Sequence, residues 1–298
     1  MNRLLAGIAT LILSLVAASA QNQPEVSLEL IIGQTQFLPS EKLPVTVRIT
    51  NHSGRTLKLG RDNEWLSFGI EEIKGAVVVR RHDPQVDGEF ELETTARASF
   101  TMDLAPHFDL SRPGSFKITA QIRLKELNLI VDSAPVAFDV IPGSIVWSQS
   151  FGIPPKANEL NSPVDRRTYI IQQANYLREV RLYLRVTDAS KGSTYAVVPI
   201  GNVVSFSKPS PMIDREARIH ILHQYGMRVY AFHLFSPDGE LLERRTYEIG
   251  ETRPTLRVNE SGNVIVVGGV RRFDKSDRAP ASATNAQPTA STTPLPKP

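Results

Sequence analysis

The sequence predicts an all-β protein of two domains, and three observations predict it. Short segments alternate apolar with polar residues, turn-forming residues separate these segments, and only short stretches suit a helix. A chain of 298 residues has room for roughly two domains. Cysteine is absent, which excludes disulfides, cysteine-ligated metal centres and cysteine nucleophiles.

Residues 1–20 have the pattern of a secretory signal peptide. A positive charge at Arg3 precedes an apolar run from Leu4 to Ala17, and Ala18-Ser19-Ala20 supplies the small residues that a signal peptidase recognises. The run is shorter than the ~20 apolar residues of a membrane-spanning helix. We therefore expect an exported protein, periplasmic or extracellular, with no transmembrane segment once the signal is removed. Export of a chain without disulfides favours a bacterial envelope.

The first domain is expected at residues 24–142, as a β-sandwich. Alternating apolar residues predict strands at Val26–Leu30, Val45–Ile49 and Phe116–Leu124. Turn residues recur between such segments at a spacing that is typical of a sandwich or barrel.

Four segments of this domain carry a resemblance to known families. They are Asn51-His52-Ser53-Gly54, the strand with Trp65, Phe68 and Ile70, the strand Ala76-Val77-Val78-Val79, and the turn Arg112-Pro113-Gly114-Ser115-Phe116. In this order they resemble a bacterial immunoglobulin-like sandwich and, more specifically, the proteinase-inhibitor family first described from an intracellular bacillar inhibitor. The resemblance implies an immunoglobulin-like fold and, through that family, inhibition of a proteinase. Many unrelated functions share this scaffold.

The second domain is expected at residues 143–273, as antiparallel hairpins. One hairpin joins Val180–Val186 to Thr194–Ile200, and another joins Ile219–Gln224 to Val229–Phe235. Gly226-Met227 at the tip of the second is typical of a two-residue type II′ turn.

An internal repeat gives this domain a weak similarity to β-propeller blades. The segment Asp188–Gly201 recurs as Asp238–Gly250, and Ile219–Leu222 recurs as Val264–Val267. Two or three blades do not close a ring. We therefore expect an open or sandwich-like arrangement of blade-like sheets. Residues 274–298 are rich in Pro, Ala and Thr and are expected to be a disordered tail, either a spacer or a free end.

The chain contains no recognisable catalytic motif. It has no nucleophile elbow, Walker loop, dinucleotide-binding glycine turn or His-Glu-x-x-His zinc helix. Its 34 basic and 31 acidic residues are interspersed, which gives no nucleic-acid footprint. We expect no enzyme activity and no cofactor. Carboxylates distant in sequence can still meet in the fold, so a hydrolase of envelope polymer stays an alternative.

Two histidines are a candidate metal site. With a turn at Gly226-Met227, His220 lies directly opposite His233. Two facing imidazoles are two candidate ligands for zinc, nickel or copper. No third ligand is evident nearby, and a purely structural role is the alternative.

A second candidate site is the stripe formed by Arg181, Tyr183 and Arg185. Alternation on a strand places these three side chains on one face. Guanidinium groups beside an aromatic ring suit an anionic polysaccharide or an acidic protein patch. A solvated sheet face covered by long side chains is the alternative.

These observations predict an exported, non-catalytic binding or scaffolding protein of the bacterial envelope. Its expected partners are an envelope protein or an anionic polysaccharide, and not nucleic acid. A proteinase inhibitor acting through the first domain is the second hypothesis, and the hydrolase is the third.

Overall fold

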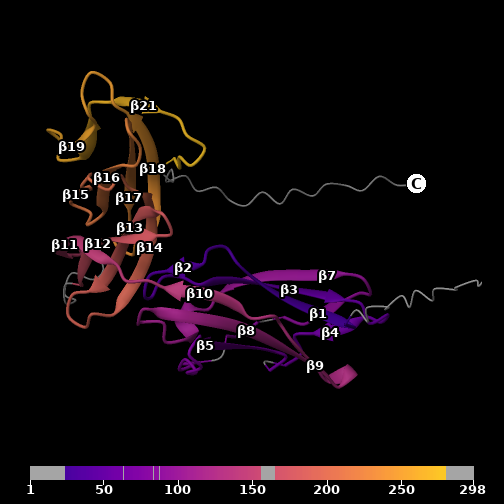
Figure 1. Cartoon of the computed structure of the whole chain (residues 1–298). Coiled ribbons are helices and arrows are strands. Elements are labelled where there is room, and N and C mark those ends of the chain that lie inside the picture. Colours follow the sequence, from indigo (N-terminus) through magenta and orange to yellow (C-terminus); the bar gives the residue numbers. More distant parts are fainter. Residues whose placement is uncertain (1–23, 63, 83, 87, 156–164, 280–298) are drawn as a thin grey trace, which may run out of the picture.

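The computed structural model describes residues 24–62, 64–82, 84–86, 88–155 and 165–279, and within these ranges the chain is all-β, as predicted. The expected signal peptide and residues 280–298 of the expected tail lie outside the described residues. Figure 1 shows two elongated units, here named the first unit (residues 24–142) and the second unit (residues 143–279), which meet beside β2 and β10. Among the described residues, no helix is long and apolar enough to cross a membrane.

Two sheets enclose the core of the first unit. Its strands are β1 (Val26–Ile32), β2 (Gln36–Phe37), β3 (Pro44–Asn51), β4 (Leu57–Leu59), β5 (Leu66–Glu72), β6 (Phe90–Leu92), β7 (Arg97–Asp103), β8 (Gly114–Leu124), β9 (Leu129–Asp132) and β10 (Val136–Val140). One sheet has the order β1-β3-β7 and the other β2-β10-β8-β5, with β9 on β8 and a separate β4-β6 ribbon. Two short 3-10 turns, η1 (Ala105–His107) and η2 (Lys125–Leu127), join strands.

The alternation in the sequence corresponds to burial in this unit. In β3, Val45, Val47 and Ile49 are fully buried and the residues between them are partly exposed. The five apolar residues expected on one face of β8, from Phe116 to Leu124, are likewise buried. Burying one face of each sheet removes these side chains from water, which stabilises the sandwich. One pairing departs from the antiparallel pattern, because β2 runs parallel to β10.

The second unit consists of two meanders and a hairpin. Its strands are β11 (Ser144–Gly152), β12 (Arg166–Tyr176), β13 (Glu179–Asp188), β14 (Thr194–Asn202), β15 (Ser210–Ile213), β16 (Ile219–Gln224), β17 (Val229–Phe235), β18 (Leu241–Glu248), β19 (Thr255–Val258), β20 (Val264–Val267) and β21 (Val270–Arg272). Within the described ranges, one sheet has the order β11-β12-β13-β14, the other β15-β16-β17-β18-β21, and β19 pairs with β20 alone.

These two sheets are the blade-like elements that the repeat predicts. Asp188–Gly201 covers the last turn and fourth strand of the first meander, and Asp238–Gly250 covers the same parts of the second. The sheets pack face to face through Leu182, Leu184 and Ile221. The other suggested repeat has no structural counterpart, because Val264–Val267 belongs to the isolated hairpin.

The hairpin register predicted for β16 and β17 is wrong by one residue. His220 lies opposite Leu234, and His233 lies opposite Ile221. Gly226 does not have a positive φ. Instead, Gly226 and Val229 exchange backbone hydrogen bonds around the tip, and the N–H of Tyr225 also donates to the Val229 carbonyl, which forms a bulge.

The physical reason for this error is that β16 is buried on both faces. Ile221 packs on the first meander, whereas Leu222 and Phe232 pack with Leu256 of β19 on the opposite face. A shift of one residue exchanges the two faces, but it exposes neither of them to water. Burial therefore did not select the register, and the turn with its bulge did.

The folded part of the second unit extends beyond residue 273, where its end was expected. The backbones of Arg244 and Arg278 exchange two hydrogen bonds of 3.0 and 3.1 Å. The carboxylate of Asp277 accepts a hydrogen bond of 2.9 Å from Thr246 Oγ1 and one of 2.8 Å from Arg271 Nη1. These contacts attach residues 274–278 to the edge of β18.

Candidate functional site

The predicted stripe of Arg181, Tyr183 and Arg185 lies on the face of β13 that meets the first unit. Tyr183 is completely buried and packs with Leu38, which follows β2 of the first unit. Its intervening neighbours Leu182 and Leu184 point to the other side, into the core between the two meanders. Most of the stripe is therefore an interface between the units and not an open ligand site.

Arg185 ties the two units together by hydrogen bonds. Its Nη2 donates to the carbonyl of Pro39 in the first unit at 2.6 Å, and its Nε donates to Gln172 Oε1 at 2.9 Å. Burial lowers the pKa of Arg185. Burial also raises the pKa of Tyr183 to about 12, so the phenol beside Arg185 stays neutral at neutral pH. A further hydrogen bond of 2.9 Å runs from the Leu177 N–H to Gln36 Oε1 of the first unit.

Arg181 differs from the other two members of the stripe, because it lines a pocket. Its guanidinium carbon lies 3.6 Å from the ring centroid of Tyr176, a cation–π contact. The pocket has a volume of about 360 Å³ and opens where β13 and β14 meet β16, β17 and β18. We name it the basic pocket. The residues that concern its chemistry are Arg181, Asn202, His223, Tyr225 and Arg244.

The second meander forms one wall of the basic pocket. This wall lies at the polar end of the space between the two sheets. His223 and His233 share the face of that meander which packs on β13, and Arg244 lies directly opposite His233. The two imidazole rings are nearly parallel, with centroids 5.4 Å apart. Nδ1 of each histidine and Nη1 of Arg244 are buried and have no hydrogen-bond partner in the described part of the chain.

Burial keeps these histidines uncharged. It lowers the pKa of His223 to about 4, against the opposing effect of a hydrogen bond to the backbone carbonyl of Asn202. Burial also lowers the pKa of His233, and the positive charge of Arg244 acts in the same direction on both rings. The wall therefore presents the guanidinium of Arg244 and one neutral imidazole, that of His223, at neutral pH, and the neutral ring of His233 is stacked on His223.

The metal site expected at His220 and His233 is wrong, because the two side chains do not face each other. His220 of β16 and His233 of β17 lie on opposite faces of their sheet, and Nε2 of His220 is 2.9 Å from Asp214 Oδ2. The pair that the fold brings together is His223 and His233, next to the cationic Arg244, whose charge disfavours a metal cation. Among the residues that the structure describes, no group of three or more His, Cys, Asp or Glu could hold a metal ion.

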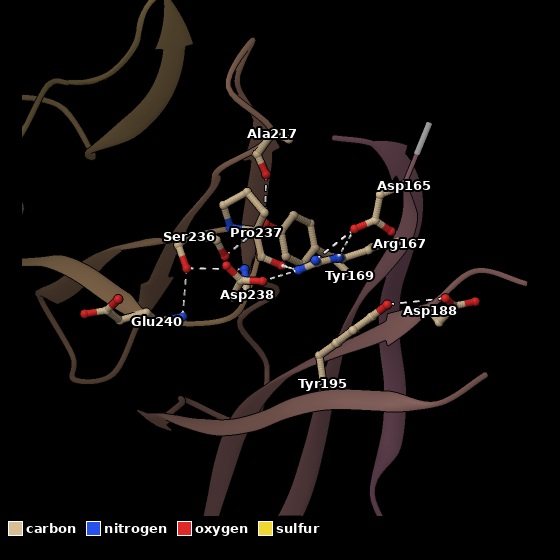
Figure 2. Close-up of polar contacts among 10 residues, drawn as sticks. All are labelled: Asp165, Arg167, Tyr169, Asp188, Tyr195, Ala217, Ser236, Pro237, Asp238 and Glu240. Carbon is tan, nitrogen blue, oxygen red and sulfur yellow. Dashed lines mark hydrogen bonds and ion pairs between the residues drawn. The ribbon is translucent and has the colours of Figure 1, made fainter. Parts of the chain in front are cut away.

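A second polar cluster fixes the far end of the two meanders. Figure 2 shows Arg167 of β12 between Asp165 and the turn that joins β17 to β18. Its guanidinium donates to the Pro237 carbonyl at 3.0 Å and to Asp238, and lies 4.3 Å from the ring centroid of Tyr195. The hydroxyl of Tyr169 donates to the Ala217 carbonyl at 2.8 Å (Figure 2). These bonds hold the two sheets together, and we assign the cluster a structural role.

The alternation in the sequence indicates Arg181 as a site residue, but no local pattern indicates Arg244 or His223. These residues come from β13, β18 and β16, and they converge only because the two meanders pack face to face. The one local indication of a pocket was a glycine, Gly201, within a strand. In the structure its φ is 138°, and β14 is irregular at this point.

Comparison with known proteins adds little to this picture. No protein-family model matches the chain, and no curated protein matches it. Among solved structures, the chain is similar to the crystal structure of Spo0M, a sporulation control protein from Bacillus subtilis, with a TM-score of 0.30 and 8% identity. The match covers 58% of this chain and 83% of that one. A likeness at this level supports no argument about fold or function.

Proposed function

We propose that the chain is an exported, non-catalytic binding or scaffolding protein of a bacterial envelope. The observation that carries this proposal is the chemistry of the basic pocket. Its described lining includes Arg181 and Arg244 but no carboxylate, serine or lysine, and His223 is held neutral by burial. Such a lining can hold an anionic group, whereas a hydrolase needs a nucleophile or a pair of acid and base groups.

The junction between the units supports a role that needs a fixed shape. Leu38 and Tyr183 are almost wholly buried against each other, and Arg185 is bonded to the Pro39 backbone. A packed and hydrogen-bonded junction restricts movement between domains, which otherwise are expected to move relative to each other. The pocket therefore lies on a unit whose orientation to the first unit is fixed.

A sedimentation experiment with the protein starting at Gln21 tests this function. The protein is mixed with isolated bacterial envelopes, either untreated or first digested with a protease or with polysaccharide-degrading enzymes. We expect it to sediment with the envelopes without releasing soluble sugar or peptide. Arg244→Gln should lose this binding, whereas Arg97→Gln, which removes an exposed charge from β7 of the first unit, should keep it.

The digested envelopes identify the class of partner. Binding that is lost only after protease treatment indicates an envelope protein, and binding lost only after polysaccharide digestion indicates an anionic polysaccharide. Failure to sediment with any preparation contradicts the proposal, and release of soluble fragments supports the hydrolase instead.

One feature of the first unit favours proteinase inhibition as a second candidate. Val77 and Val79 are 77% and 69% exposed, on a segment that hydrogen bonds hold on both sides. The Val78 N–H donates to the Ile70 carbonyl, and the Asp109 N–H donates to the Val79 carbonyl, each at 3.0 Å. An exposed segment that is already ordered loses little entropy when a protease binds it.

Titration against serine, cysteine, aspartic and metallo-proteases tests this candidate. Inhibition that is lost in Val77→Asp supports it, and the exposed Ile130→Asp on β9 is the matched control. Absence of inhibition at micromolar excess removes the candidate.

A further inference from the structure

The basic pocket combines features that together indicate the chemistry of its ligand. It has two guanidinium groups from different sheets, a buried imidazole, an asparagine and a half-buried tyrosine. A volume of about 360 Å³ lies at the lower end of the range for small-molecule sites. The pocket therefore suits one small group of a ligand.

The charges of the pocket lining favour an anion, although the carboxylate of Glu179, outside the lining, accepts a hydrogen bond from the Asn202 amide. Arg181 and Arg244 line it, and Arg244 Nη1 is buried without a hydrogen-bond partner among the described residues. The carboxylate of Asp274 lies beyond hydrogen-bond distance of Arg244, with its Oδ1 3.9 Å from Nη1. On the other side, the negative charge of Glu41 in the first unit attracts Arg181, while the hydrogen bonds that its carboxylate accepts come from the Leu38 N–H and the Gln34 amide. In the described part of the chain, no hydrogen bond joins the guanidinium of Arg181 or Arg244 to a carboxylate, although that of Arg181 also contacts the ring of Tyr176, so both groups can donate to an anionic oxygen.

His223 adds a requirement for a hydrogen-bond donor. Its side chain is nearly fully buried, and its Nδ1 has no partner, whereas the hydrogen bond to the Asn202 carbonyl uses the other ring nitrogen as donor. In this tautomer Nδ1 can only accept a hydrogen bond. Because Nδ1 has no accessible surface in this structure, a ligand that carries a hydroxyl next to its anionic group reaches this imidazole only when the side chains around it shift.

We propose that the basic pocket binds a uronic acid residue of an acidic polysaccharide, with its carboxylate between Arg181 and Arg244. A uronate places a carboxylate and hydroxyl groups on one sugar ring, and Tyr225 supplies an aromatic surface of the kind that sugar rings pack on. The ring centroids of Tyr225 and His223 are 6.4 Å apart, so one sugar can contact both. This inference rests on the proposed binding function and specifies its ligand.

Calorimetric titration of the protein starting at Gln21 tests the proposal. The probes are a trimer of galacturonic acid, a neutral hexose trimer of the same linkage, and inorganic phosphate. We expect binding of the uronate trimer only. Arg181→Gln and Arg244→Gln should each weaken it at least tenfold, and Arg244→Lys should weaken it less, because Lys keeps the charge but loses the fork of donors.

Arg97→Gln is the matched control and should leave the affinity unchanged, while circular dichroism verifies that every variant is folded. Equal binding of phosphate or of the neutral trimer would overturn the assignment to a uronate, as would unchanged affinity in both arginine variants. The outcome is separable from the proposed function. Envelope binding without uronate binding overturns only this inference, whereas uronate binding without envelope binding overturns the function and leaves the pocket assignment.

Discussion

Tyr183 of the second unit packs against Leu38 of the first, and the two side chains are 0% and 1% exposed. A tyrosine on the stripe that the sequence offered as a ligand surface is thus the centre of the junction between the units. The strand alternation was interpreted correctly, because Arg181, Tyr183 and Arg185 do share a face. What covers that face is the protein itself.

The junction should be sensitive to truncation of Leu38. Leu38→Ala removes apolar contacts with Tyr183 and leaves a cavity, which should cost about 2–5 kcal/mol of the free energy of unfolding. Chemical denaturation measures this loss, and small-angle scattering should show a larger radius of gyration when the junction loosens. Val77→Ala, at an exposed position, is the control and should change stability by less than about 0.5 kcal/mol. A stable Leu38→Ala variant of unchanged dimensions would contradict the packed junction.

Stability should fall in mildly acidic solution because of His223. Burial lowers its pKa to about 4, from 6.5 in the unfolded chain, so the unfolded state binds more protons between these values. The free energy of unfolding is therefore highest above pH ~6.5. It falls by on the order of 3 kcal/mol as the pH falls towards 4, because the unfolded chain gains a proton that the buried His223 does not. Urea denaturation at pH 7.5 and 4.5 measures the difference. His223→Gln should make it smaller, and the exposed His52→Gln is the control. Equal pH dependence in wild type and His223→Gln would refute the assignment.

Asp214 should matter more than its exposed neighbour Glu216. Burial raises the pKa of Asp214, but hydrogen bonds from His220 and Arg218 outweigh this effect, and the pKa is lowered overall. Its carboxylate accepts bonds from His220 Nε2 at 2.9 Å and Arg218 Nε at 2.8 Å. Asp214→Ala leaves the buried His220 donor unpaired, at a cost of about 1–3 kcal/mol. Glu216→Ala removes only an exposed ion pair with Arg218 and should cost about 0–1 kcal/mol. Similar losses in the two variants, in thermal or urea denaturation, would show that the Asp214 cluster is not specifically stabilising.

Gly201 and Gly226 should respond differently to alanine. Gly201 has a φ of 138°, so Gly201→Ala should cost about 1–3 kcal/mol although no atom lies within 4 Å of the new methyl group. Gly226 does not have a positive φ, and its new methyl group would approach Val229 no closer than 3.5 Å. Gly226→Ala should therefore be neutral or stabilise by up to about 1 kcal/mol. Strong destabilisation by Gly226→Ala would favour the type II′ turn and the register that the structure excludes.

The strands β1, β3, β5 and β8 of the first unit could be predicted because each sheet there buries one face, whereas the strand expected at Ala76–Val79 is not formed. In β3 the alternation of Val45, Val47 and Ile49 with polar residues corresponds directly to burial. The same argument failed at β16, where five successive residues from Ile219 to His223 are buried. A strand with apolar partners on both sides has no polar face that could identify its register.

The sequence by itself determined the all-β class, the positions of strands with clear alternation such as β3, β8 and β13, and the side of β13 on which Arg181, Tyr183 and Arg185 lie, because these properties depend on neighbours within a few residues. Only the tertiary structure decided that Tyr183 and Arg185 are covered by the first unit, that His223 and not His220 lies beside His233, and that Arg181 and Arg244 line one pocket. Arg181 and Arg244 are on different sheets, and a local pattern holds no information about which sheet packs on which. That choice is made by the apolar faces of both meanders, which remove the largest area from water only when they pack against each other.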